Sequence, residues 1–322
     1  MDNMADQAQL LRRTRLALQE NNFKEAIRCL KQAAKLARDA GDVASEGRHL
    51  GNLALIYYRT QQPEKALGAF QKALLSARTD ADRLTEDGIL GNMGNILREI
   101  GRYDDAIAHL NQALLIAQEI GDVRGRGIWL SNLGLVYDDI QQSAKAVDFH
   151  KEAVNVARLM HDQRGLASRL ANLGNSYVKS SKTSEALKCF HETVAIYKSL
   201  GDLAEAALRQ GIIGNIYSDL GRTSPSNEEA IICYGLAADA YKETLGMAQE
   251  LNDLPAQAEL LGSLGNVYGN TGDYNQALAY FYDAQRLFSQ LGMSDRLPHL
   301  QANIDLAEDY RRQQASGGQT PS

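Results

Sequence analysis

The feature that most constrains this chain is an alanine that returns every 40 residues. Five members of the series are evenly spaced, and two more follow at intervals of 44 and 47 residues. A repeat of this length predicts an array of stacked units, because each unit must cover its apolar face with a neighbour. The series comprises Ala26, Ala66, Ala106, Ala146, Ala186, Ala230 and Ala277.

Each unit has the pattern of two helices joined by a short turn. Before Ala106, apolar residues from Leu90 to Leu97 are spaced by three and four, which indicates one face of a helix. Gly101 interrupts that helix, and a second apolar stripe runs on through Leu110. The same pattern covers nearly the whole chain, so we expect an all-α fold.

The boundary between units is marked by a glycine followed by an aspartate. Glycine can take the left-handed conformation that ends one helix, and aspartate can accept the first amide hydrogens of the next. Gly41-Asp42, Gly121-Asp122 and Gly201-Asp202 have this form, with His161-Asp162 and Asn252-Asp253 as variants.

We expect a single array over residues 1–314, followed by a disordered tail at 315–322. One pair departs from the period: residues 221–227 add four residues to its inner turn, and the helix after Ala230 gains seven. A helix at about 298–312 would cap the array, because an end unit would otherwise expose its core face. The expected pairs are about 7–40, 42–80, 82–120, 122–160, 162–200, 202–252 and 253–292.

Small, aromatic and leucine residues stand at fixed offsets in every unit. In the third unit they are Leu90, Gly94, Leu97, Gly101, Tyr103, Ala106, Leu110 and Ala113. Through these positions the chain resembles the tetratricopeptide repeat family. The repeat of 40 instead of 34 residues, without the usual proline, is similar to the long-helix subclass of Pins/LGN adaptors, kinesin light chains and bacterial regulators.

The resemblance implies a right-handed α-solenoid of about seven antiparallel helix pairs with a C-terminal capping helix. Members of the family usually bind extended or helical peptides on the concave surface, which is lined by the first helix of each pair. We therefore expect a protein or peptide partner on that face.

Two columns of asparagine fall on the side of the first helices that faces away from their partners. An asparagine side chain can donate to and accept from the main chain of a bound peptide. It can instead bond the backbone of the adjacent helix and set the spacing of the repeats. The first column is Asn52, Asn92, Asn132 and Asn172, and the second is Asn95, Asn175, Asn215 and Asn266.

Other candidates for the concave face are charged or aromatic. Arg48, Arg59 and Arg98 lie towards the N-terminal end and Asp138 in the middle, so a partner could be oriented by its charge. Trp129 is the only tryptophan, and it could equally be an interface anchor or a packing residue between repeats.

Composition argues against several other functions. The net charge is −6, which favours neither nucleic acid nor an acidic membrane, although residues 1–60 hold ten Lys and Arg against seven Asp and Glu. Three distant cysteines and a polar N-terminus point to the cytoplasm. No histidine pair has metal-ligand spacing and no glycine loop follows a strand, so we expect no catalytic residue, metal or cofactor.

The sequence thus favours a non-enzymatic scaffold or adaptor that binds a peptide segment in its concave groove. Two alternatives remain. One is a regulatory sensor whose superhelix binds a small molecule or a signalling peptide, and the other is a subunit that self-associates.

Overall fold

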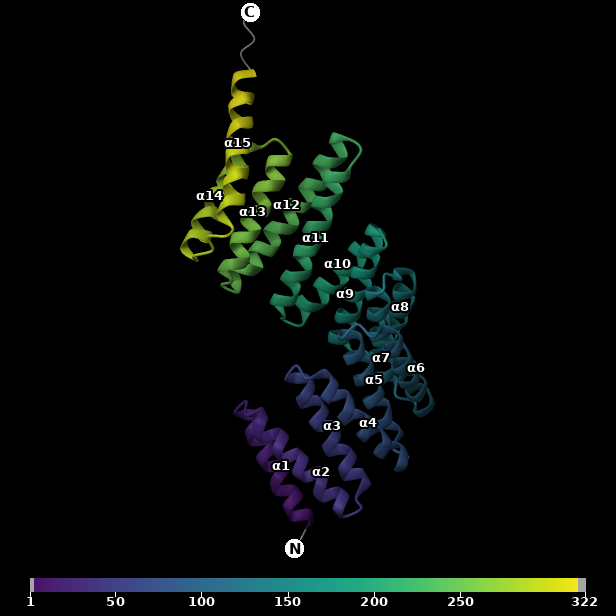
Figure 1. The fold of residues 1–322 in the computed structure, drawn as a ribbon. Helices are drawn as coiled ribbons and strands as arrows, with labels where there is room; N and C mark the ends of the chain where they lie inside the picture. The colour runs from purple at the N-terminus through teal and green to yellow at the C-terminus, as the bar shows by residue number, and fades with distance from the viewer. Residues whose placement is uncertain (1–2, 318–322) are drawn as a thin grey trace, which may run out of the picture. The chain divides into compact units, whose positions relative to one another are not determined.

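Residues 3–317 are described by the computed structural model, and they form fifteen α-helices and no strand (Figure 1). This confirms the all-α solenoid of seven antiparallel pairs with one further helix. The chain divides into two compact units, Met1–Asp162 and Gln163–Ser322. The single domain expected over residues 1–314 stays a prediction.

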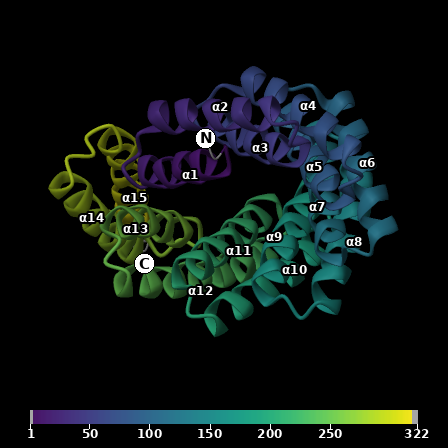
Figure 2. The same cartoon turned by 90° about the horizontal axis from the view of Figure 1, so that it is seen from below.

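Unit 1 holds the first four helix pairs. Viewed in Figure 2, α3, α5 and α7 form one layer and α4, α6 and α8 a second layer. Each helix packs against its partner, the second helices α2, α4 and α6 also pack against the first helix of the next pair, and α5 contacts α7 directly. The bounds are α1 (Asn3–Gln19), α2 (Phe23–Asp39), α3 (Val43–Arg59), α4 (Pro63–Thr79), α5 (Arg83–Glu99), α6 (Tyr103–Ile120), α7 (Val123–Asp139) and α8 (Ser143–Leu159).

Unit 2 holds three pairs and a last helix. Here α9, α11 and α13 form one layer and α10, α12 and α14 the other (Figure 2). The bounds are α9 (Gln163–Lys179), α10 (Thr183–Ser199), α11 (Leu203–Thr223), α12 (Asn227–Glu250), α13 (Leu254–Asn270), α14 (Tyr274–Gln290) and α15 (Leu297–Gly317).

The turns have the chemistry that the sequence predicts. Gly41, Gly121 and Gly201 adopt φ near +72°, and His161 and Asn252 take the same left-handed conformation with φ of +53°. Asp42, Asp122, Asp202 and Asp253 accept the amide hydrogen of the residue three positions on, as Asp122 does from Gly125 at 2.9 Å.

Inside each pair, a small residue on the first helix admits a large one from the second. A Cβ atom on Gly94 would lie 2.6 Å from Cγ of Leu110, and one on Gly174 would lie 2.9 Å from the ring of Phe190. These glycines are therefore needed for the two helices of a pair to pack closely.

The sixth pair has a different alignment from the one expected. The glycine of α11, Gly214, packs against Tyr241, and Ala237 is fully buried four residues earlier, whereas Ala230 is only half-buried. The insertion therefore lengthens both helices at their shared turn: α11 gains residues at its end and α12 at its start. A shift of seven residues is about two helical turns, so the apolar pattern alone cannot tell which end of α12 is extended.

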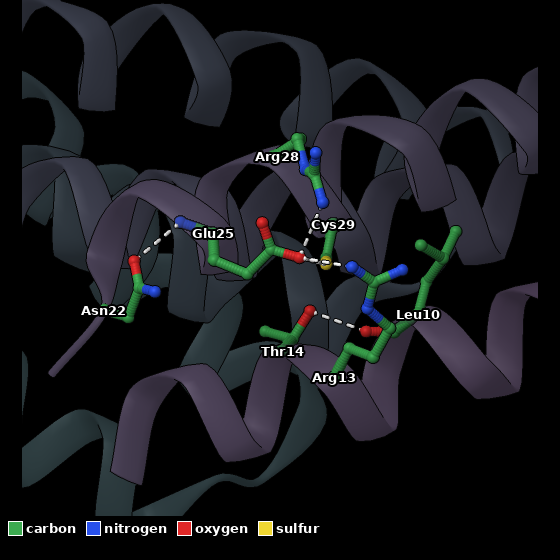
Figure 3. A network of polar contacts seen from close by, with 7 residues as sticks. All are labelled: Leu10, Arg13, Thr14, Asn22, Glu25, Arg28 and Cys29. Carbon is green, nitrogen blue, oxygen red and sulfur yellow. Dashed lines mark hydrogen bonds and ion pairs between the residues drawn. The ribbon is translucent and has the colours of Figure 1, made fainter. Parts of the chain in front are cut away.

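The first pair is held by a polar network as well as by its core (Figure 3). Glu25 of α2 forms ion pairs with Arg13 of α1 at 2.6 Å and with Arg28 at 2.9 Å. Arg28 and Arg13 hold the pKa of this carboxyl below its usual range. The thiol of Cys29 donates to the same carboxylate, and burial raises the pKa of the thiol.

The last helix covers the end of unit 2. Leu300, Ile304 and Ala307 of α15 are buried against the core that includes Phe281 and Phe288 of α14. This is the capping role expected for residues 298–312. The helix extends through Gly317, so residues 315–317 of the expected tail are helical, and residues 318–322 lie outside the described part of the chain.

Candidate functional site: a polar groove along three first helices

The layer of first helices in unit 1 contains a hollow of about 190 Å³, which we call the polar groove. It is lined by Tyr58 of α3, by Asn92, Asn95 and Arg98 of α5, and by Asn132 of α7. The hollow thus brings together four residues that the sequence analysis assigned to the binding face. In the sequence they are spread over a segment of 41 residues, from Asn92 to Asn132.

Two nitrogen donors at this groove are not satisfied. Nδ2 of Asn132 and Nε of Arg98 are buried and have no hydrogen-bond partner among the described residues. Arg98 does form an ion pair with Asp139, whose Oδ2 lies 3.6 Å from Nε. A buried donor without an acceptor, such as Nδ2 of Asn132, costs about 1–3 kcal/mol. A ligand that supplies acceptors would remove that cost.

A second polar contact closes one side of the groove. The hydroxyl of Tyr58 donates to a carboxylate oxygen of Glu99 across α3 and α5. Burial of the ring, followed by this hydrogen bond, raises the pKa of Tyr58 to about 12, so the hydroxyl stays protonated. The repeat pattern does not identify this contact, because Tyr58 and Glu99 belong to different repeats.

Leucines complete the groove where the second asparagine column is interrupted. Leu55 and Leu135 occupy the positions of Asn95 in the neighbouring repeats, and both line the hollow. The groove therefore alternates amide and apolar side chains, an arrangement that suits a peptide with exposed main-chain groups and apolar side chains.

Two predicted surface residues lie in the packed interior, and we correct their assignment. Trp129 is 7% exposed, its ring covers Gly91 of α5, and its indole N–H donates to Asp87 at 2.7 Å. Asp138 is 6% exposed and lies 3.5 Å from the fully buried His150 of α8. Trp129 is thus the packing residue between repeats, and Asp138 belongs to the α7–α8 contact.

The remaining candidates of unit 1 lie outside the polar groove. Arg48 and Asn52 are exposed on α3, and Arg48 donates to the hydroxyl of Ser45 at 2.9 Å. Arg59 is exposed and lies over the ring of Phe23, 5.2 Å from its centroid.

The asparagines of unit 2 are divided between surface and internal contacts. Asn175 is exposed and Asn172 is half-buried on α9. Asn215 accepts a hydrogen bond from the hydroxyl of Tyr241 at 2.7 Å, and Asn266 accepts one from Asn303 of α15 at 3.0 Å. Asn215 and Asn266 thus bond side chains of neighbouring helices, which is neither of the two roles expected for the asparagine columns.

Unit 2 has its own hollow, of about 490 Å³, between α11 and α13 with α12 beneath. Its lining is mostly apolar, with Leu208 and Ile212 on α11 and Leu260 on α13. Asp253 and Glu259 provide the only carboxylates among the residues that line it. Ile212 stands where earlier repeats have the first asparagine column, which explains the change from a polar to an apolar surface.

No group of three His, Cys, Asp or Glu suited to a metal ion occurs in residues 3–317. Within the same range, every helix is too short or too polar to cross a membrane.

Family models match most of the chain. Models described as tetratricopeptide repeat match residues 11–82, 86–158 and 258–290. A model described as soluble NSF attachment protein matches residues 136–260. Among curated protein sequences, none matches the chain.

Solved structures with the same fold have low sequence identity. The apo form of RapI is 14% identical with a TM-score of 0.63, covering 88% of this chain and 99% of RapI. BtubC from P. vanneervenii is 20% identical with a TM-score of 0.55, covering 71% and 92%. A Rap protein complexed with competence and sporulation factor is 16% identical with a TM-score of 0.55, covering 85% and 78%. At these identities the likeness shows the fold alone.

Proposed function

The chain belongs to the tetratricopeptide repeat family, and we propose that it is a non-enzymatic adaptor that holds a peptide segment of a partner protein in the polar groove of unit 1. Supporting this, the similar Rap structure was solved with a bound factor, so the fold can carry a ligand.

The observation that carries the proposal is the pair of unsatisfied donors at the groove. Asn132 and Arg98 each keep a buried nitrogen without a hydrogen-bond acceptor among the described residues. A peptide supplies carbonyl oxygens in a regular row, and a small rotation of either side chain would turn its donor towards them. Asn92 and Asn95 add amides that can donate and accept on the same strand of peptide.

The test compares capture of partners by groove variants and by a surface control. We expect Asn95→Ala combined with Arg98→Ala to lose the proteins that the unchanged protein enriches from an extract of its native cells. Hydrogen bonds from a charged donor contribute about 1.5–3 kcal/mol, so calorimetry with the purified partner should show at least a tenfold loss of affinity.

The matched control is Asn111→Ala, which removes an exposed asparagine from the second helix α6. It should bind as the unchanged protein does. If the groove variant folds, as judged by circular dichroism, and still binds the partner with unchanged affinity, the polar groove is not the binding site.

A second function, a sensor of a small molecule or signalling peptide, is favoured by the apolar hollow of unit 2. Its volume of about 490 Å³ lies within the range of small-molecule sites. Thermal-shift screening should then find an apolar ligand that raises the melting temperature by mass action. Ile212→Asp should abolish the shift, and a ligand whose effect survives that change binds elsewhere.

We also propose that the protein acts in a reducing compartment, the cytoplasm. Its three cysteines form no disulfide among the described residues, and Cys29 and Cys189 are buried.

A further inference from the structure

The cleft between the second helices α2 and α4 is unusually basic. Five cations and no carboxylate line this hollow, which has a volume of about 600 Å³. We call it the basic groove, and its cations are Lys31, Lys35 and Arg38 of α2 and Lys65 and Lys72 of α4. It lies on the layer opposite to the polar groove and is separate from it.

Most of this charge is not neutralised by the protein itself. Arg38 forms an ion pair with Glu46. None of the four lysines has an ion-pair partner among the described residues, although Asp6 and Asp39 line an adjacent hollow together with Lys35. The lysines are exposed, so their charge is available to an anionic partner.

The floor of the basic groove is apolar. The ring of Tyr57 lies between Lys31 and Lys65, whose ammonium nitrogens are 5.9 and 5.8 Å from its centroid. Leu75 is 69% exposed at the edge, and a Cβ atom on Gly68 would meet nothing within 4 Å. The groove therefore offers apolar surface between two rows of positive charge.

Stacking of the repeats does not require these lysines. In the next cleft, between α4 and α6, the positions 40 residues further on hold Gln71 in place of Lys31, Asp105 in place of Lys65 and Gln112 in place of Lys72. The position of Gly68 is taken there by Ala108, which is exposed. Both clefts lie between second helices of successive repeats, so the repeat pattern does not account for the lysines of the first one.

We propose that the basic groove binds an acidic amphipathic helix of a partner protein. The groove runs between two helices of 17 residues, each about 25 Å long, so it can take several turns of a third helix laid along them. An apolar stripe would cover Tyr57 and Leu75, and glutamates on its two flanks would meet the lysines of α2 and α4.

The proposal is tested with the full chain and a designed probe. The probe is a fluorescein-labelled peptide of about 16 residues with leucine at the positions that form one helical stripe and glutamate on both flanks. Fluorescence anisotropy should show saturable binding that weakens as salt is added. A second peptide, with lysine in place of glutamate, should not bind.

Two variants and one matched control locate the binding. Lys65→Glu should weaken binding of the probe at least tenfold, and Gly68→Leu should block it by filling the groove without harming the helix. Lys145→Glu is the control, because Lys145 occupies the same repeat position and lies over Tyr137 at 5.2 Å, but is outside the groove. It should bind the probe as the unchanged protein does.

Each other outcome overturns the proposal. Absence of saturable binding, equal binding of the lysine peptide, or an equal loss with Lys145→Glu would show that the groove does not recognise an acidic helix. Binding to phosphatidylserine vesicles that is lost with Lys65→Glu, without binding of the probe, would assign the groove to a lipid surface instead.

Discussion

A buried carboxylate, Asp87, illustrates how single residues set the contacts between repeats. It is 2% exposed on α5 and accepts a hydrogen bond from Trp129 of α7. His49 on α3 forms a corresponding contact with Gln7 on α1, which is also 42 residues away in the sequence. Nε2 of His49 lies 3.1 Å from Oε1 of Gln7. The two pairs use the same repeat positions with different chemistry, so each contact joins neighbouring first helices through one polar bond.

Asp87 should make the stability of the protein depend on pH in an unusual direction. Burial, partly opposed by the hydrogen bond from Trp129 and reinforced by the charge of Asp122, raises the pKa of Asp87 from 3.8 to about 6. The folded state then binds a proton before the unfolded state does as the pH falls. The contribution of Asp87 is therefore full below pH 3.8 and is lost as the pH rises through about 6.

The measurement is urea unfolding of the unchanged protein and of Asp87→Asn between pH 4.5 and 7.5, with the difference isolating this residue. We expect the variant to be the more stable at pH 7.5, with an advantage of at most about 3 kcal/mol that shrinks as the pH falls. The emission of Trp129, the only tryptophan, should titrate with a midpoint near pH 6 in the unchanged protein alone. An advantage that does not change with pH would contradict the assignment.

At the residue scale, sequence reasoning found part of the candidate site. Asn92, Asn95, Arg98 and Asn132 could be predicted, because helical spacing fixes which side of a helix they occupy. The choice between the two roles offered for Trp129 could not be made from the sequence, since its burial depends on Gly91 leaving room for the indole on another helix.

At the scale of the helices, the sequence was enough to predict the helix boundaries. It was also enough to detect the extra residues of the sixth pair, but not which end of α12 they lengthen. Gly-Asp pairs and their variants mark the ends because the turn needs a left-handed residue and the next helix needs a cap. A seven-residue insertion leaves the apolar stripe of α12 in phase, so only the packing of Gly214 against Tyr241 locates it. Burial raises the pKa of Tyr241 to about 12, and its protonated hydroxyl donates to Asn215.

This alignment of α11 with α12 predicts opposite effects for two glycines three residues apart. A Cβ on Gly214 would lie 2.6 Å from the ring of Tyr241, so Gly214→Ala should destabilise the protein by about 1–3 kcal/mol. A Cβ on Gly211 would meet only Thr244, at 3.8 Å, so Gly211→Ala should stabilise it by up to about 1 kcal/mol.

Both glycine variants are measured by chemical unfolding followed by circular dichroism. If Gly214→Ala were neutral, Tyr241 would not be the residue that packs on this glycine, and Tyr234, seven residues earlier, would be the alternative.

At the scale of the whole molecule, a destabilising change in one repeat should affect only the adjacent repeats, because each helix packs against those nearest to it in the sequence. The repeat period was enough to predict this architecture. It could not predict the division into Met1–Asp162 and Gln163–Ser322, since the period runs through residue 162 without interruption.

The capping helix provides a test of this local behaviour. Ile304 is 2% exposed in the core of the last pair, and Leu306 on the same helix is 55% exposed. Ile304→Ala should weaken the docking of α15 by about 2–4 kcal/mol, whereas Leu306→Ala should change stability by less than about 0.5 kcal/mol.

Hydrogen exchange measured by mass spectrometry shows which helices are destabilised by the substitution. With Ile304→Ala, exchange should accelerate in α13, α14 and α15, because α15 contacts α13 and α14 and covers Phe281 and Phe288. Exchange in α1 to α8 should keep its rate, since those helices form a separate compact unit. Faster exchange throughout α1 to α8 would mean that the two units unfold together, and the cap would then stabilise the entire chain instead of its last pair.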